Sequence, residues 1–92
     1  MNSSAWAMAS VRDASLFVIY VELYQRLDAK AQLALFHEQE TWLAKRKKLV
    51  QAKYTPDRST DAGLNASAEH MDLTDKRIKE LSERLAKMKP AA

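Results

Sequence analysis

Residues that break regular secondary structure are scarce in this chain, and that scarcity limits the folds open to it. The 92 residues include one glycine, Gly63, and two prolines, Pro56 and Pro90. A β-sandwich or β-barrel needs a turn about every 8–12 residues, and such turns favour Gly, Pro, Asn or Asp. The chain is therefore expected to be all-α, with few connections between its helices.

The same counts exclude several classes of functional site. The chain has no cysteine, so it has neither a disulfide framework nor a thiolate zinc site. A glycine-rich phosphate-binding loop needs more than one glycine. The longest apolar run, residues 16–21, is far shorter than the roughly 20 residues of a membrane-spanning helix. We therefore expect no membrane span.

Apolar residues recur at helical spacing along most of the chain, and these stripes define the expected helices. The last stripe is the clearest, with steps of three and four residues: Met71, Thr74, Ile78, Leu81, Leu85 and Met88. We predict a flexible tail over residues 1–10 and one helical domain over residues 11–89. Its helices are expected at about 11–27, 29–54 and 66–89, with a loop at 55–65.

One point in this organisation stays open. Residues 11–54 contain no Gly or Pro and could form one long helix, whereas Asp28 is a suitable cap for a second helix. Ser10 followed by Asp13 reads as the start of the first helix, because a hydroxyl cap is often followed by an acidic residue three positions on. The fold class is in either case a helical hairpin or a three-helix bundle.

The expected core is thin. Alanine supplies 15 of the residues in the hydrophobic fraction of 47%, and alanine buries little surface. A chain of this length is marginally stable even with a fuller core. We therefore expect either a homodimer that forms a larger bundle or a partner that covers the apolar face.

The sequence does not favour catalysis or metal binding. His37 and His70 are the only imidazoles. The nearest approach to a helical metal site is His37 with Glu40 or Thr41, and it lacks a second strong ligand. No serine has a histidine and an acid placed as catalytic partners. We expect no enzyme activity, no metal and no cofactor.

The excess positive charge lies in one helical turn. The formal net charge is +3, and residues 28–55 hold six basic and three acidic residues. Four of these basic residues are consecutive: Lys45, Arg46, Lys47 and Lys48. Consecutive residues point around the whole helix and make no single basic stripe, so a nucleic-acid partner is not expected.

Five residues are predicted to form a polar layer that fixes how the helices align. Gln39, Trp42 and Arg46 lie along one edge of an apolar stripe, where a polar side chain is costly unless it is paired. Their expected partners are Thr74, Arg77 or a carboxylate on the last helix, or the carbonyl end of a helix.

Two of these elements resemble a known family. Residues 39–46, Gln-Glu-Thr-Trp-Leu-Ala-Lys-Arg, are similar to the Gln-x-x-Trp-Leu-x-x-Arg element of LprI-type lysozyme inhibitor domains. Residues 73–81, Leu-Thr-Asp-Lys-Arg-Ile-Lys-Glu-Leu, are similar to that family's Leu-Thr-x-x-Arg-x-x-x-Leu element. The resemblance covers about residues 20–85, and Tyr24 stands where members usually have a tyrosine. It implies a small helical domain of the bacterial envelope that inhibits lysozyme or neutralises a related toxin.

The chain departs from the family pattern at three points. Val50 and Glu69 occupy the regions where members usually carry cysteines. The spacing from Tyr24 to Gln39 is about one turn shorter, which favours a continuous first helix. No export signal is recognisable in the sequence. The resemblance implies the periplasm, and these departures make the cytoplasm the alternative.

The resulting functional hypothesis is a protein-binding inhibitor or immunity protein that acts on a cell-wall hydrolase or toxin. The residues of this chain that we expect to contact the target are Lys45, Lys47 and Lys48. The positive net charge argues for a target less basic than animal lysozymes. The alternative is a cytoplasmic coiled-coil adaptor or a secretion-chaperone-like subunit whose core a partner completes.

Overall fold

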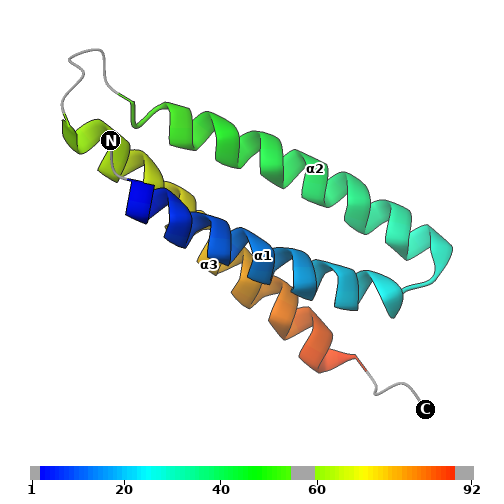
Figure 1. The fold of residues 1–92 in the computed structure, drawn as a ribbon. Coiled ribbons are helices and arrows are strands. Elements are labelled where there is room, and N and C mark those ends of the chain that lie inside the picture. Colours follow the sequence, from blue (N-terminus) through cyan, green and yellow to red (C-terminus); the bar gives the residue numbers. More distant parts are fainter. Residues whose placement is uncertain (1–2, 55–59, 89–92) are drawn as a thin grey trace.

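Three helices form the described part of the molecule. The computed structural model describes residues 3–54 and 60–88, with side chains for residues 4–54 and 63–88. The helices are α1 (Ser3–Gln25), α2 (Ala29–Gln51) and α3 (Thr60–Lys87). Helices α1 and α3 run in the same direction and α2 runs opposite to both (Figure 1). The predicted all-α three-helix bundle is thus confirmed.

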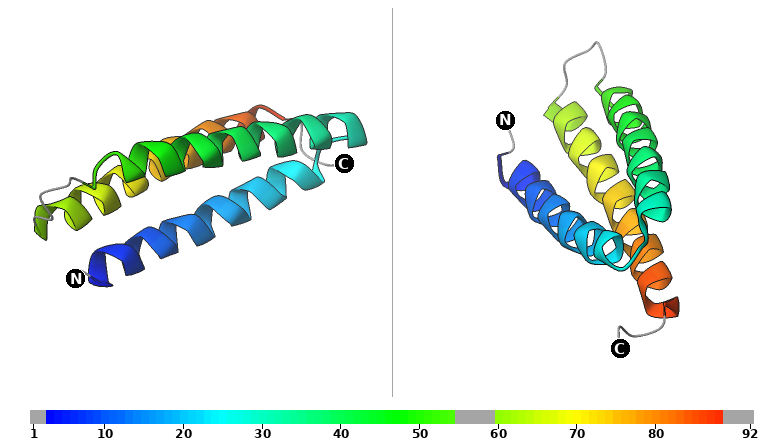
Figure 2. Two further views of the ribbon diagram at one scale, coloured as in Figure 1. Left: turned by 90° about the horizontal axis from the view of Figure 1, so that it is seen from above. Right: turned by 90° about the vertical axis from the view of Figure 1, so that its right-hand side faces the viewer.

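The helices are packed unequally. Helix α1 has its most extensive contacts with α3, whereas α2 packs less closely on α3 and touches α1 only sparsely. Figure 2 shows the same asymmetry from two other directions, with α1 and α2 lying apart along much of their length. The side of α1 that faces away from α3 is therefore left largely open.

The core is a small leucine cluster to which every helix contributes. Leu16 and Leu23 of α1, Leu35 of α2 and Leu81 of α3 are each at most 4% exposed. Partly buried side chains pack around them: Ile19, Tyr20, Leu27, Trp42, Ile78, Leu85 and Met88.

Residues 11–54 form two helices, because the chain reverses between Gln25 and Ala29. The Asp28 side chain caps α2 by accepting a hydrogen bond from the Ala31 amide at 2.8 Å. The Gln32 side-chain amide donates to the Tyr24 carbonyl at 2.9 Å and so caps the end of α1. A continuous helix would forgo both caps.

Helix α1 begins at Ser3, so the tail expected over residues 1–10 is wrong for residues 3–10. Alanine-rich residues favour the helix locally, and tertiary contacts hold it. Ala9 is 2% exposed, and the Trp6 ring packs edge-on against His70 at 5.7 Å. The Ser10 hydroxyl donates to the Trp6 carbonyl inside the helix, so Ser10 is not its cap.

Helix α3 begins at Thr60, so residues 60–65 are helical and do not belong to the expected loop. The rest of that loop, residues 55–59, lies outside the described residues. Gly63 is inside the helix, where glycine costs only about 1 kcal/mol relative to alanine. Burial of Ala66 at 0% and Ser67 at 1% holds this end of α3 against the bundle.

Candidate functional site

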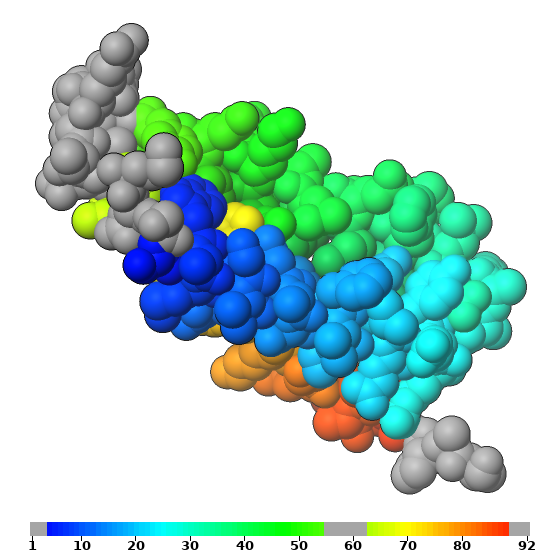
Figure 3. Space-filling model, in the orientation of Figure 1, coloured from blue at the N-terminus to red at the C-terminus, as the bar shows by residue number. Residues whose placement is uncertain are grey.

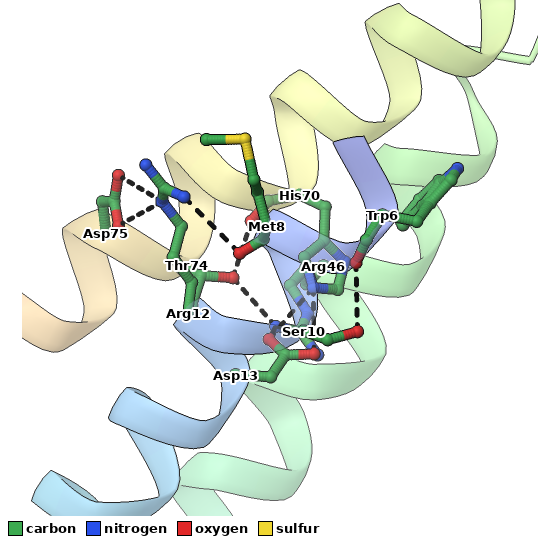
Figure 4. Close-up of polar contacts among 9 residues, drawn as sticks. All are labelled: Trp6, Met8, Ser10, Arg12, Asp13, Arg46, His70, Thr74 and Asp75. Atoms are coloured by element: carbon green, nitrogen blue, oxygen red, sulfur yellow. Dashed lines mark hydrogen bonds and ion pairs between the residues drawn. The ribbon is translucent and has the colours of Figure 1, made fainter. Parts of the chain in front are cut away.

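Two clusters of polar side chains join the helices, and each is built around an arginine. The first, the Arg46 cluster, consists of Asp13, Arg46, His70 and Thr74 (Figure 4). The Arg46 Nη1 atom donates to Asp13 Oδ1 at 2.7 Å and to Thr74 Oγ1 at 2.9 Å. One guanidinium of α2 therefore binds side chains of both other helices.

The remaining members complete the Arg46 cluster. Thr74 is fully buried, and its hydroxyl donates to the His70 carbonyl at 2.6 Å. His70 Nε2 lies 3.0 Å from Asp13 Oδ1. Beside this cluster, Arg12 Nε donates to both Asp75 oxygens at 3.1 and 3.2 Å, which adds another contact between α1 and α3.

The second group, the Arg77 cluster, consists of Glu38, Gln39, Arg77, Glu80 and Arg84. Arg77 is 4% exposed, and its Nε donates to Gln39 Oε1 at 3.0 Å. Its two terminal nitrogens donate to Glu38, at 2.7 Å, and to Glu80. A buried arginine is thus neutralised by acids of both α2 and α3, which sets the alignment of these helices.

Trp42 lies between the two clusters. The Arg46 guanidinium carbon is 4.8 Å from the centre of the Trp42 ring, and that of Arg77 is 5.8 Å away. Both distances allow a cation–π attraction. The structure therefore brings together all five residues predicted for the polar layer: Gln39, Trp42, Arg46, Thr74 and Arg77.

Sequence reasoning missed the acidic partners. From the sequence, Asp13 marks the start of a helix and His70 has no expected partner. The charge of Arg46 on an apolar stripe was a usable signal that a carboxylate had to lie nearby. Its carboxylate belongs to the first helix, however, and not to the last, where we expected it.

Glu38 is the acid with the clearest change in proton affinity. Partial burial alone would raise the pKa of its carboxyl, but the hydrogen bonds and the positive charges of Arg84 and Arg77 together outweigh burial and lower the pKa below 4.5. The folded state therefore binds this proton less readily than the unfolded state. Glu38 thus contributes stability above pH 4.5, and that stability is lost as the pH falls through the lowered pKa.

We therefore expect Glu38→Gln to destabilise the protein at neutral pH and to have less effect as the pH falls below 4.5. Urea unfolding of both proteins across this pH range measures the difference. Glu83→Gln is the control, because Glu83 is exposed and makes no ion pair within the described part of the chain. A Glu38→Gln effect that stays constant with pH would contradict the assignment.

The predicted contact residues Lys45, Lys47 and Lys48 form the basic turn, near the end of α2. All three are exposed, and none forms an ion pair with a residue that the structure describes. Arg46 lies among them in sequence but turns inward to Asp13 and Thr74. The basic turn therefore presents three ammonium groups that have no ion-pair partner among the described residues, on a backbone that Arg46 holds in place.

An apolar groove runs between α1 and α2 beside the basic turn. Its cavity of about 340 Å³ is lined by Leu16, Phe17, Tyr20, Phe36 and Leu43, with Arg46 and Asp13 also on its wall. Burial, and then the nearby Tyr24 and Glu40, raise the pKa of the Tyr20 hydroxyl. The groove could hold an apolar side chain of a partner.

The described residues contain no group of three or more His, Asp or Glu side chains able to hold a metal ion. His37, for example, is mostly exposed and has only Glu40 beside it, at 3.4 Å. Among the same residues, no helix is both long enough and apolar enough to span a membrane.

A family model described as lysozyme inhibitor LprI matches residues 1–81. Comparisons with curated proteins and with solved structures found no match. The matched range includes α1, α2 and most of α3, and with them Trp42 and the arginines at the centre of both clusters.

Proposed function

The chain belongs to the LprI lysozyme inhibitor family, and on that premise we propose that it binds and inhibits a cell-wall hydrolase or a toxin of that kind. The family is one of inhibitors, which fits a protein that is not itself an enzyme. Both clusters tie helices together through ion pairs, and such pairs serve structure rather than chemistry.

The contact surface that we propose is the basic turn. The observation that carries this proposal is that, within residues 45–48, the arginine points inward and the three lysines point into solvent. Arg46 is held by Asp13 and Thr74 across three helices, whereas its three lysine neighbours are exposed and unpaired within the described residues. A backbone that is already held in place loses little conformational freedom on binding, so the main ordering cost is that of the lysine side chains themselves.

The chemistry of the target follows from those charges. Glycoside hydrolases hold a pair of carboxylates on either side of the bond that they cleave. An ammonium group of Lys45, Lys47 or Lys48 that enters such a cleft would pair with a carboxylate and block the substrate. The net charge of +3 slows association with a strongly basic enzyme, so the preferred target is neutral or acidic.

Changing Lys45, Lys47 and Lys48 together to Glu should reduce inhibition by about 100-fold, because attraction to the carboxylates becomes repulsion. The measurement is the clearing of a cell-wall suspension by purified lysozymes of differing net charge, with and without the protein. A variant with Lys30, Lys79 and Lys87 changed to Glu is the matched control, because these exposed lysines lie elsewhere and the net charge becomes the same.

The outcomes separate the parts of the proposal. Equal inhibition by the two variants would show that the basic turn is not the contact surface. Failure of the unmodified protein to inhibit any enzyme of the panel would argue against the inhibitor function itself.

The alternative function is an adaptor whose core is completed by another protein. The observation that favours it is the exposed apolar side of α1, where Val11, Phe17 and Val18 are 66%, 65% and 63% exposed. Absence of inhibition, together with a stable complex isolated from the cytosol, would support the adaptor.

A further inference from the structure

The groove between α1 and α2 carries one acidic charge more than its basic side chains neutralise. Figure 3 shows the atoms of α1 (blue to cyan) beside those of α2 (green) on one face of the molecule, and side chains of both helices line the groove. Its charged lining residues are Asp13, Glu40 and Arg46. Asp13 and Arg46 pair with each other at 2.7 Å. The charge that remains on the groove wall is therefore the carboxylate of Glu40.

Glu40 is available to a partner. Its side chain is 56% exposed, and its contact with His37 at 3.4 Å is an ion pair only while that imidazole is protonated. No arginine or lysine pairs with Glu40 among the described residues. Burial, then Tyr24 and then Glu40 raise the pKa of the Tyr20 hydroxyl, so the charge of Glu40 is felt inside the groove.

Aromatic rings line the groove beside this acid. Phe17, Tyr20 and Phe36 supply three rings, and the cavity of about 340 Å³ between them is large enough for a side chain of a partner. The negative face of an aromatic ring attracts a cation, and arginine is the protein cation that most often lies there. Rings beside a carboxylate therefore match a guanidinium group.

The same chain combines these three groups in its interior. The guanidinium groups of Arg46 and Arg77 lie 4.8 and 5.8 Å from the centre of the Trp42 ring, and each also pairs with a carboxylate at 2.7 Å. The groove has the rings and the carboxylate of this arrangement. Its own guanidinium, that of Arg46, is already held by Asp13.

We propose that the groove binds an arginine side chain of the protein partner, with the guanidinium against the aromatic rings and paired with Glu40. The inference rests on the proposed function in one respect, namely that the partner is a protein that also contacts the basic turn. An apolar side chain alone would leave Glu40 without a counter-charge, and a carboxylate would be repelled. An arginine satisfies the ring faces and the acid together.

The basic turn is compatible with an incoming cation. Lys47 lies on the same face of α2 as Glu40, because seven residues make almost two full turns. The two positions are roughly 10 Å apart along the helix, which exceeds the screening length of about 8 Å at physiological salt. A partner that presents an arginine to Glu40 and a carboxylate to Lys47 therefore meets an opposite charge at both points.

The first test uses the full chain alone, at pH 8, where an ordinary imidazole is neutral. The probe is the peptide acetyl-Leu-Arg-Leu-amide, and its counterpart carries citrulline, a neutral side chain with the shape of arginine. The arginine peptide should bind about 10-fold more tightly and should shift the NMR signals of Tyr20 and Phe36. Glu40→Gln should remove this preference.

Glu83→Gln is the matched control, because it removes the same charge from an exposed position on α3 that does not line the groove. It should keep the preference for the arginine peptide. Both variants should fold normally, since both side chains are exposed. Equal binding of the two peptides, or a preference that Glu40→Gln leaves unchanged, would overturn the proposal.

The second test connects the groove with the target enzyme. Glu40→Gln should weaken inhibition about 10-fold more than Glu83→Gln does. Equal inhibition by these two variants would show that the target places no arginine in the groove. The two proposals fail separately, because absence of all inhibition contradicts the inhibitor function, whereas the peptides still decide whether the groove binds arginine.

Discussion

Replacing Leu81 with alanine should lower the free energy of unfolding by about 2–5 kcal/mol, the range found for buried leucines. Leu81 is fully buried, and it meets Leu16, Leu23 and Leu35 in the one cluster that all three helices share. Domains of this size have a total stability of about 5–15 kcal/mol. The change should therefore remove a large part of the stability and leave much of the protein unfolded at moderate temperature.

Urea unfolding followed by tryptophan fluorescence measures this loss, because Trp42 packs against the cluster. All variants need the same protein concentration, since any dimer makes the apparent stability depend on concentration. Leu33→Ala is the control, because Leu33 is 58% exposed and should change stability by at most about 0.5 kcal/mol. Equal losses for the two variants would contradict the assignment of the core.

The interior of the fold could be predicted from the sequence because helical periodicity identifies it directly. Leu81 belongs to a stripe with steps of three and four residues, and Leu16 and Leu23 belong to another. The ends of the helices could not be predicted in the same way. The helix over residues 3–10 is held by contacts such as that of Trp6 with His70, which join residues far apart in the sequence. Residues 60–65 include the turn-forming Asp61, Gly63 and Asn65, which conceal the helix that begins at Thr60.

The residues of the candidate site also fall into those that the sequence predicts and those that it does not. Gln39, Arg46, Thr74 and Arg77 could be identified because a polar side chain on an apolar stripe needs a partner. Their acidic partners Asp13, Glu38 and Glu80 could not, because exposed carboxylates are common on helices and look alike in sequence. Only the packing of α1 beside α2 selects Asp13 for Arg46.

Replacing Arg77 with alanine should lower the free energy of unfolding by about 2–4 kcal/mol, since charge-assisted hydrogen bonds and packing are lost together. The expected loss is smaller than for a fully buried ion pair, because the Glu38 and Glu80 side chains are 42% and 51% exposed and can be rehydrated. Gln39 would also lose its hydrogen bond from Arg77.

Two further substitutions of Arg77 separate packing from hydrogen bonding. Arg77→Met keeps most of the side-chain volume and removes every polar contact. If the hydrogen bonds dominate, its loss of unfolding free energy should be close to that of Arg77→Ala. Arg77→Lys keeps the charge but lacks the planar fork that reaches Gln39, Glu38 and Glu80 at once, so it should recover only part of the stability. Urea unfolding at one pH compares all three.

The coupling between Arg77 and Glu38 decides whether the Arg77 cluster acts as a unit. In a double-mutant cycle, Glu38→Gln should lower the free energy of unfolding much less in the Arg77→Ala background than in the unmodified protein. Some cost should remain, because Arg84 also donates to Glu38 at 2.7 Å. Additive losses would mean that Arg77 and Glu38 stabilise the bundle independently, and the alignment of α2 on α3 would then need another explanation than this ion pair.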